Sequence, residues 1–294
     1  MILTGKAKLA GIMGWPVGHS LSPRLHNYWL DLHGIDGAFV PLPVAPEHFA
    51  HALRLLPLVG FQGVNITVPH KEAALEAIDI VEPIAHRIGA VNTVTVQADG
   101  ALKGTNTDAA GFTAHLLATV PGFNAASGPC VVIGAGGAAR AVAVALQDLG
   151  AGEIHIVNRT LARAEALALA LGNSVRVIDW TGRVQALGDA SLVVNTTTQG
   201  MIGEPPLDLG LDSLPPQTVV FDIVYNPLET PLLATARRRG NPVVDGLGML
   251  LHQAVAGFEA WFGVRPTVDD ALRVHVLGPL LGRALDRPQG ADTP

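Results

Sequence analysis

The chain has 294 residues, of which 49% are hydrophobic and 15% are charged, and its formal net charge is −6. This composition is typical of a well-packed globular protein and excludes an intrinsically disordered chain. The acidic balance, together with the lack of any run of lysine and arginine, argues against nucleic acid as a partner. The length favours two domains.

The use of cysteine predicts that the protein resides in a reducing compartment, and the use of cysteine and histidine predicts that it binds no metal. The single cysteine, Cys130, opens an apolar run and is predicted to be a buried strand residue, so neither a disulfide nor a thiolate metal site is expected. The 11 histidines follow no ligand spacing, and no metal site is predicted. We identify no signal peptide, and prolines and glycines interrupt the uncharged stretch 109–139, so we expect a cytoplasmic protein without a membrane span.

The first third of the chain alternates short apolar runs with segments of helical spacing, which predicts a parallel α/β architecture. Strands are predicted at 9–13, 38–42 and 64–68, and helices at 23–33 and 47–56. Asp99 and Gly100 are typical of a hairpin turn between two further strands, at 91–96 and 101–104.

Two serines stand two residues apart where the first of these helices is predicted to begin. The hydroxyls of Ser20 and Ser22 and the positive end of the helix dipole would favour the same ligand, an anion. The pattern fits equally well a loop serine followed by an ordinary N-cap at Ser22, with Pro23 at the first helical position.

A polar strand end follows at Thr67, shortly before Pro69, which is predicted to start a helix. Lys71 would then lie in the first turn of that helix beside Thr67, where positive charge is disfavoured. This setting would favour the neutral amine, as proton transfer by a lysine requires. A solvated surface lysine is the alternative interpretation.

Polar residues also flank the predicted hairpin, with Asn92 before it and Asp108 after it. The Asp108 carboxylate would pair with Lys71 and accept a hydrogen bond from a substrate hydroxyl. Its alternative role is to cap a helix predicted from Gly111 onward.

The most informative local pattern is the glycine-rich turn after the apolar run 130–133. Gly134, Gly136 and Ala139 fill the G-x-G-x-x-G/A spacing, in which the first glycine permits a tight turn, the second lets backbone approach a pyrophosphate, and the small third residue lets helix pack on strand. Free N–H groups at the start of the next helix would face the phosphates. Such a turn alone also fits a tight strand–helix connection, but a strand before it and a helix after it favour a cofactor.

The next predicted strand, at 153–157, ends in Asn158, Arg159 and Thr160. A site for NAD usually places Asp or Glu here to bind the ribose 2′-OH. A carboxylate would repel a 2′-phosphate, whereas the Arg159 guanidinium would bind it through charge-assisted hydrogen bonds. The sequence therefore predicts NADP(H) as the cofactor, with an ordinary surface charge at Arg159 as the alternative.

Further strands are predicted at 175–178, 192–195, 219–223 and 243–244, and helices at 247–262 and 267–285. The fold class is therefore α/β, with an N-terminal substrate-binding and catalytic domain at 1–110 and a Rossmann-type NADP-binding domain at 111–246. The C-terminal helices at 247–286 are expected to return to the first domain, and 287–294 to form a disordered tail. The cleft between the two domains is the natural place for chemistry.

Seven motifs in fixed order make the chain resemble the shikimate dehydrogenase family. They are Gly-His-Ser-Leu-Ser-Pro at 18–23, Asn-Ile-Thr-Val-Pro-His-Lys at 65–71, Ala-Val-Asn-Thr at 90–93, Asn-Thr-Asp at 106–108, Gly-Ala-Gly-Gly-Ala-Ala-Arg at 134–140, Asn-Arg-Thr at 158–160 and Asp-Gly-Leu-Gly-Met-Leu at 245–250. Each motif alone is weak, but the ordered set covers nearly the whole chain. The resemblance implies NADPH-dependent, reversible reduction of 3-dehydroshikimate to shikimate in aromatic amino acid biosynthesis. We expect a monomer or homodimer that binds this small-molecule substrate.

The resemblance also implies roles for individual residues. Lys71, paired with Asp108, would be the general acid/base. The substrate carboxylate would bind Ser20, Ser22 and Tyr225, and the ring hydroxyls would bind Thr67, Asn92, Asp108 and Gln253. The pyrophosphate would lie on Gly134, Ala135, Gly136, Gly137 and Ala138. The 2′-phosphate would lie among Asn158, Arg159, Thr160 and Arg163, and Ile223 and Gly246 would lie by the nicotinamide.

Three other functions fit the sequence less closely. A quinate/shikimate dehydrogenase would share the site but accept quinate or NAD, and Arg159 in place of an acid argues for the stricter enzyme. A non-catalytic NADP-binding regulator would keep the fold, but it needs no proton donor such as Lys71. A different α/β dehydrogenase would leave the paired serines unexplained.

Overall fold

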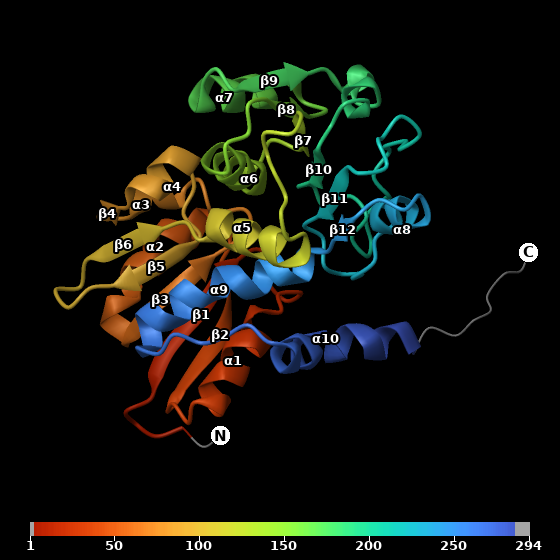
Figure 1. Cartoon of the computed structure of the whole chain (residues 1–294). Coiled ribbons are helices and arrows are strands. Elements are labelled where there is room, and N and C mark those ends of the chain that lie inside the picture. The colour runs from red at the N-terminus through yellow and green to blue at the C-terminus, as the bar shows by residue number, and fades with distance from the viewer. Residues whose placement is uncertain (1–2, 286–294) are drawn as a thin grey trace, which may run out of the picture.

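The computed structural model describes residues 3–285, which form two α/β units, each built on its own six-stranded sheet (Figure 1). The predicted fold class is confirmed. The predicted tail at 287–294 lies outside the described residues.

The first sheet has the strand order β2-β1-β3-β5-β6-β4. Its strands are β1 (Lys8–Gly14), β2 (Gly37–Pro43), β3 (Phe61–Ile66), β4 (Ile80–Val81), β5 (Thr93–Val96) and β6 (Leu102–Thr105). β1 pairs in parallel with β2 and β3, whereas β5 is antiparallel to both β3 and β6. The antiparallel β5–β6 pair is the predicted hairpin, so this sheet is mixed rather than wholly parallel.

The second sheet is parallel throughout and has the order β12-β11-β10-β7-β8-β9. Its strands are β7 (Cys130–Ile133), β8 (Ile154–Val157), β9 (Val175–Ile178), β10 (Leu192–Asn195), β11 (Val219–Asp222) and β12 (Val243–Val244). The first strand of the unit lies in the middle, as in dinucleotide-binding folds. Ligands bind such a sheet at the carboxyl ends of its strands, where the strand order reverses.

Helices pack against both sheets (Figure 1). In the first unit they are α1 (Ser22–Leu32), α2 (Phe49–Leu55), α3 (Ala74–Ala77) and α4 (Pro83–Ile88), with 3-10 turns at Pro46–His48 and Pro57–Val59. The second unit contains α6 (Gly137–Asp148), α7 (Leu161–Leu171) and α8 (Pro231–Arg238), with 3-10 turns at Trp180–Gly182 and Gln185–Leu187. α5 (Asp108–Thr119) joins the two units and contacts both α6 and α9 (Gly246–Phe262).

The last two helices, α9 and α10 (Asp270–Leu285), follow the second unit in the chain and pack on elements of the first. α9 lies between α5 and the first sheet (Figure 1). Near its end the fully buried Trp261 donates a hydrogen bond from its indole nitrogen to the Val94 carbonyl oxygen at 2.9 Å. α10 packs against α1 and α9. Within residues 3–285 none of the helices has the length and apolar character needed to cross a membrane.

Candidate active site

A cleft of about 240 Å³ lies where the two units meet, at the carboxyl ends of β3 and β11. The predicted residues that line it are Ser20, Ser22, Thr67, Lys71, Asn92, Asp108, Ala138, Ile223, Tyr225, Gly246 and Gln253. The structure thus brings every predicted substrate-side residue into one cavity, together with three of the predicted cofactor-side residues.

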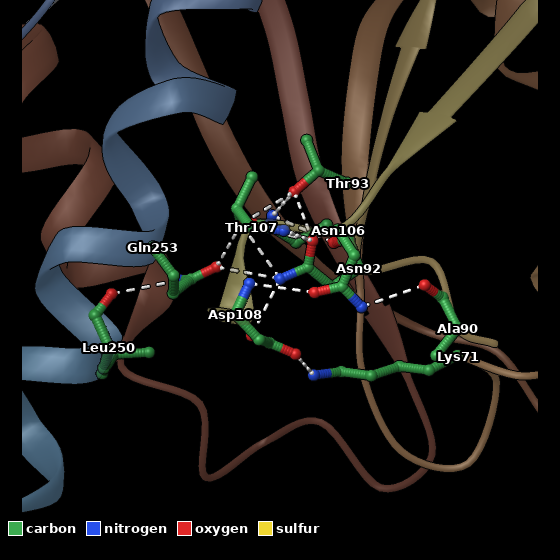
Figure 2. A network of polar contacts seen from close by, with 10 residues as sticks. Lys71, Ala90, Asn92, Thr93, Asn106, Thr107, Asp108, Leu250 and Gln253 are labelled. Carbon is green, nitrogen blue, oxygen red and sulfur yellow. Dashed lines mark hydrogen bonds and ion pairs between the residues drawn. The ribbon is translucent and has the colours of Figure 1, made fainter. Parts of the chain in front are cut away.

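Lys71 and Asp108, which both line this cleft, form an ion pair (Figure 2). The Lys71 Nζ lies 2.5 Å from Oδ2 of Asp108, and the two side chains are only 20% and 8% exposed. Asp108 is the first residue of α5, and the side chain of the N-cap residue Thr107 makes no capping hydrogen bond. Because the Asp108 carboxylate is used by Lys71 and Asn92, its contacts favour the pairing role over the capping role.

Asn92 connects this pair to the rest of the cleft (Figure 2). Its side-chain amide donates to Oδ1 of Asp108 at 2.8 Å and to Oγ1 of Thr107 at 3.0 Å. Its Oδ1 accepts from the Thr107 N–H at 2.9 Å and from the Thr93 hydroxyl at 2.9 Å. Gln253 on α9 reaches the same group, with its Oε1 3.4 Å from the Asn92 nitrogen. These contacts fix the orientation of the Asp108 carboxylate.

Sequence reasoning missed several buried polar residues of this region, among them Asn65 and Thr107. Asn65 lines the cleft, and its side chain donates to the Asn92 carbonyl oxygen and to the Thr93 hydroxyl, both at 3.2 Å. Thr107 contacts both Asn92 and Gln253. The alternation of side chains along an extended chain was a usable indication, since Asn65 lies two residues before Thr67 and so faces the same side.

The predicted helix starting at Pro69 is wrong. Residues 68–73 form turns, and α3 begins only at Ala74. The Lys71 carbonyl oxygen accepts a hydrogen bond from the Val91 N–H at 2.8 Å, so this segment follows a neighbouring stretch of chain instead of winding into a helix. The argument from a helix dipole at Lys71 therefore has no structural basis, and the Asp108 carboxylate is its charged partner instead.

The two serines lie at the entrance to α1, as predicted, but neither hydroxyl caps the helix from the N-cap position. α1 begins at Ser22 itself, its N-cap residue is Leu21, and no side-chain capping bond is formed there. The capping interpretation of Ser22 is therefore wrong. Ser20 Oγ accepts from the Ser22 N–H at 3.2 Å, and both serines line the cleft, where their hydroxyls can donate to an anion.

The turn from Gly134 to Ala138 fits a pyrophosphate. Gly134 has a φ of +119°, and a Cβ there would lie 2.5 Å from Oγ1 of Thr196, so only glycine is accommodated. At Gly136 a Cβ would meet nothing within 4 Å, which leaves open space in front of the turn. α6 begins directly afterwards at Gly137, so its first N–H groups face that space.

The end of β8 presents an exposed basic surface. Arg159, Thr160 and Arg163 are exposed, and in the part of the chain from 3 to 285 neither arginine forms an ion pair. Asn158 is half-buried, and its amide donates to the Thr160 carbonyl oxygen at 2.8 Å, which closes the turn before α7. Two free guanidinium groups beside a glycine turn suit a phosphate on the ribose.

The proton-transfer pair and the cofactor turn are close to each other. A Cβ placed on Gly137 would lie 3.7 Å from Cδ of Lys71. Across the cleft, Ile223 and Tyr225 follow the end of β11, and burial raises the pKa of Tyr225, so its hydroxyl stays protonated and can donate. Among the described residues no group of three or more His, Cys, Asp and Glu side chains is arranged to hold a metal ion.

The second unit has a Rossmann-type sheet with a glycine turn, and the first α/β unit supplies a lysine–aspartate pair. Together these features define the class of two-domain dinucleotide-dependent oxidoreductases. Three family models match the chain: "Shikimate dehydrogenase substrate binding domain" at residues 12–94, "Shikimate / quinate 5-dehydrogenase" at 119–204, and "Shikimate 5'-dehydrogenase C-terminal domain" at 246–273. The chain belongs to the shikimate dehydrogenase family, which confirms the predicted resemblance.

Individual relatives agree with this assignment. The shikimate dehydrogenase (NADP(+)) of Paramagnetospirillum magneticum is 58% identical over 275 residues, covering 94% of this chain and 100% of the relative, and that of Rhodospirillum rubrum is 57% identical over 281 residues, covering 94% and 99%. Among solved structures, the shikimate 5-dehydrogenase of Thermus thermophilus in complex with NADP(H) and shikimate is 38% identical with a TM-score of 0.81, covering 93% of this chain and 99% of that chain. A quinate dehydrogenase of Corynebacterium glutamicum in complex with NAD is 32% identical with a TM-score of 0.86, covering 92% and 99%.

Proposed function

We propose that the protein is an NADP-dependent oxidoreductase that reversibly reduces 3-dehydroshikimate to shikimate, with Lys71 as general acid/base. The observation that carries this proposal is the position of the Lys71–Asp108 pair, which lies in the cleft directly beside Gly137 of the cofactor turn. A proton donor is thus placed next to the expected source of hydride. The relatives named as NADP(+) enzymes support the choice of cofactor.

NADPH, when bound, supplies the hydride that is transferred to the carbonyl carbon of the substrate. The Lys71 ammonium donates a proton to the carbonyl oxygen as it becomes a hydroxyl, and in the reverse direction the neutral amine accepts that proton. Asp108 holds the Lys71 amine in place at 2.5 Å, and Asn92 in turn fixes Asp108. The hydroxyls of Ser20, Ser22 and Tyr225 would bind the substrate carboxylate, and Thr67, Asn92 and Gln253 would bind ring hydroxyls.

A rate matrix tests the function directly. Initial rates of reduced-nicotinamide formation are measured with shikimate or quinate, each paired with NADP⁺ or NAD⁺. Fast turnover only with shikimate and NADP⁺ supports the proposal. Comparable rates with quinate or NAD⁺ would assign the broader quinate/shikimate enzyme, and tight NADP⁺ binding without turnover would assign a regulator.

Arg159→Asp is expected to weaken NADP⁺ binding far more than NAD⁺ binding. The guanidinium would no longer pair with the 2′-phosphate, and the loss of one charge-assisted contact corresponds to roughly ten- to a hundredfold in affinity. Binding of both cofactors is measured by calorimetry. The control is Arg238→Asp, the same change at an exposed position on α8. Equal losses of affinity for NADP⁺ and NAD⁺ in Arg159→Asp would mean that Arg159 does not contact the 2′-phosphate.

The double variant Ser20→Ala/Ser22→Ala is expected to raise the KM for shikimate by about ten- to a hundredfold, because two hydrogen bonds to a carboxylate are removed. The kcat should change much less, since neither serine takes part in proton transfer. Steady-state kinetics with varied shikimate measure both constants, with Ser213→Ala on the exposed surface of the second unit as control. An unchanged KM would argue that the serines serve only the local chain conformation.

We also propose the domain boundaries and domain roles that were predicted from the sequence. Residues 1–110 would form the substrate-binding and catalytic domain, 111–246 the NADP-binding domain, and the helices within 247–286 would belong to the first domain. The proposed assembly is a monomer or homodimer, and the proposed compartment is the cytoplasm.

A further inference from the structure

Asp245, which directly precedes the cleft residue Gly246, is held by three helices at once. Its Oδ1 accepts from the Leu247 N–H at 3.0 Å and so caps α9. Its Oδ2 accepts from the guanidinium of Arg273 on α10 at 2.6 Å. Its carbonyl oxygen accepts from Nε2 of His115 on α5 at 2.9 Å.

The His115 contact is fixed in direction. Burial lowers the pKa of His115, so the ring is neutral, and because a carbonyl oxygen can only accept, the ring hydrogen lies on Nε2. The ring is also pressed against α9, since a Cβ at Gly248 would lie 2.0 Å from its Nδ1. Asp245 is therefore tied to α5 as well as to its own helix.

The backbone at Gly246 packs directly against that of Ile223. A Cβ at Gly246 would lie 2.2 Å from the Ile223 carbonyl oxygen, so the two segments are in close backbone contact. Both Gly246 and Ile223 line the cleft. Because Asp245 is covalently bonded to Gly246, the contacts that hold Asp245 also restrain this backbone pair.

The same turn of α10 also reaches the substrate side of the cleft. Arg24, two residues after Ser22 on α1, donates from Nε to the His275 carbonyl oxygen at 2.6 Å. His275 lies two residues after Arg273, and α10 runs beside α1 (Figure 1). The segment of α10 from Arg273 to His275 thus contacts both α1, through Arg24, and Asp245 at the start of α9.

We propose that Arg273 is a positioning residue, which acts through Asp245 to hold the Gly246–Ile223 backbone in the place where it receives the nicotinamide ring. α10 thereby sets the affinity for the nicotinamide end of the cofactor, although it does not touch the cofactor itself. This inference rests on the proposed function, because it assigns the cofactor to this cleft.

The test measures binding of NADPH by fluorescence titration and binding of adenosine 2′,5′-bisphosphate, which lacks the nicotinamide, by calorimetry. Arg273→Met is expected to raise the Kd for NADPH by about tenfold, as for one lost charge-assisted hydrogen bond, and to leave the bisphosphate Kd unchanged. Asp245→Asn, in which the side-chain oxygen can still cap α9, should have a similar effect, and the double variant should be no worse than either single one. Arg273→Lys should recover part of the affinity.

Arg265→Met is the matched control, because Arg265 forms an exposed ion pair with Glu259 elsewhere on the C-terminal part of the chain. An unchanged Kd for NADPH in Arg273→Met, or an equal loss for both probes, would overturn the proposal. If the unmodified protein binds NADPH but does not oxidise shikimate, only the proposed reaction fails, because these titrations contain no substrate. If it does not bind NADPH, both fail.

Discussion

Lys71→Ala is expected to lower kcat by about 10²–10⁴-fold while the KM for shikimate changes little. Removal of the amine leaves the binding groups of the cleft in place but deletes the group that exchanges a proton with the reacting oxygen. Asp108 keeps its hydrogen bond from Asn92, so its carboxylate retains a partner in the variant. The effect should therefore fall on the chemical step, and stopped-flow or steady-state measurement of NADPH formation separates kcat from KM.

Lys103→Ala supplies a matched control. Lys103 also pairs with a carboxylate, Glu82, at 2.6 Å, but its side chain is 41% exposed and lies on β6. This variant should keep kcat within about twofold, since exposed ion pairs contribute little. If Lys71→Ala behaved like the control, Lys71 would be a structural partner of Asp108, and the proton donor would have to be sought elsewhere in the cleft.

The cofactor turn could be predicted because its determinants are local. The requirement for glycine at Gly134 comes from its own φ of +119°, and the glycine spacing directly follows strand β7 and directly precedes helix α6 in the sequence. The second restriction at Gly134, the close approach of Thr196, is not local and could not be predicted. The strand and helix segments of the second unit could be predicted in the same way, from alternating apolar runs and helical spacing.

The conformation around Lys71 could not be predicted because its cause is distant in sequence. The pattern Thr-Val-Pro indicated a helix start at Pro69, but the hydrogen bond from the Val91 N–H holds the segment in turns. The contact between Arg273 and Asp245 is non-local in the same sense, since it depends on how α10 packs after the chain has returned to the first unit. A lone aspartate before a glycine gives no indication in the sequence of its partner in a later helix.

Two fully buried side chains that sequence reasoning did not single out make stability depend on pH in opposite directions. His26 lies in an aromatic environment, with its ring 4.1 Å from that of Phe39, and burial lowers its pKa to about 3. Asp222 ends β11, and burial raises its pKa to about 6, although hydrogen bonds from Thr230 at 2.6 Å and from Asn195 at 2.9 Å oppose the shift.

The sign of each contribution follows from proton linkage. His26 has a folded pKa below its ordinary value of 6.5, so the unfolded chain takes up the proton first and stability is lost as the pH falls from 6.5 toward 3. Asp222 has a folded pKa above its ordinary value of 3.8, so its contribution is present below 3.8 and is lost as the pH rises through about 6. Between about pH 7.5 and about pH 5, acidification costs about 2 kcal/mol through His26 and adds about 1.5 kcal/mol through Asp222.

Because these two contributions nearly cancel in the unmodified protein, only variants separate them. His26→Phe keeps an aromatic ring beside Phe39, and relative to the unmodified protein it should gain about 2 kcal/mol of unfolding free energy on going from about pH 7.5 to about pH 5. Asp222→Asn keeps an acceptor for Asn195 and presents an amide to the Thr230 hydroxyl. Relative to the unmodified protein, it should lose about 1.5 kcal/mol over the same range.

Urea denaturation at the two pH values measures both changes, and the comparison within each variant removes any constant cost of the substitution. The other carboxylates, such as Asp79 with its pKa lowered by Arg54, contribute equally to all three proteins and drop out. Changes of opposite sign in the two variants would establish that burial of His26 and Asp222 governs the acid response. No change in one variant would mean that the side chain it replaces has the same pKa in the folded and unfolded chain, and changes of the same sign would mean that one of the two pKa values is shifted in the direction opposite to that expected from burial.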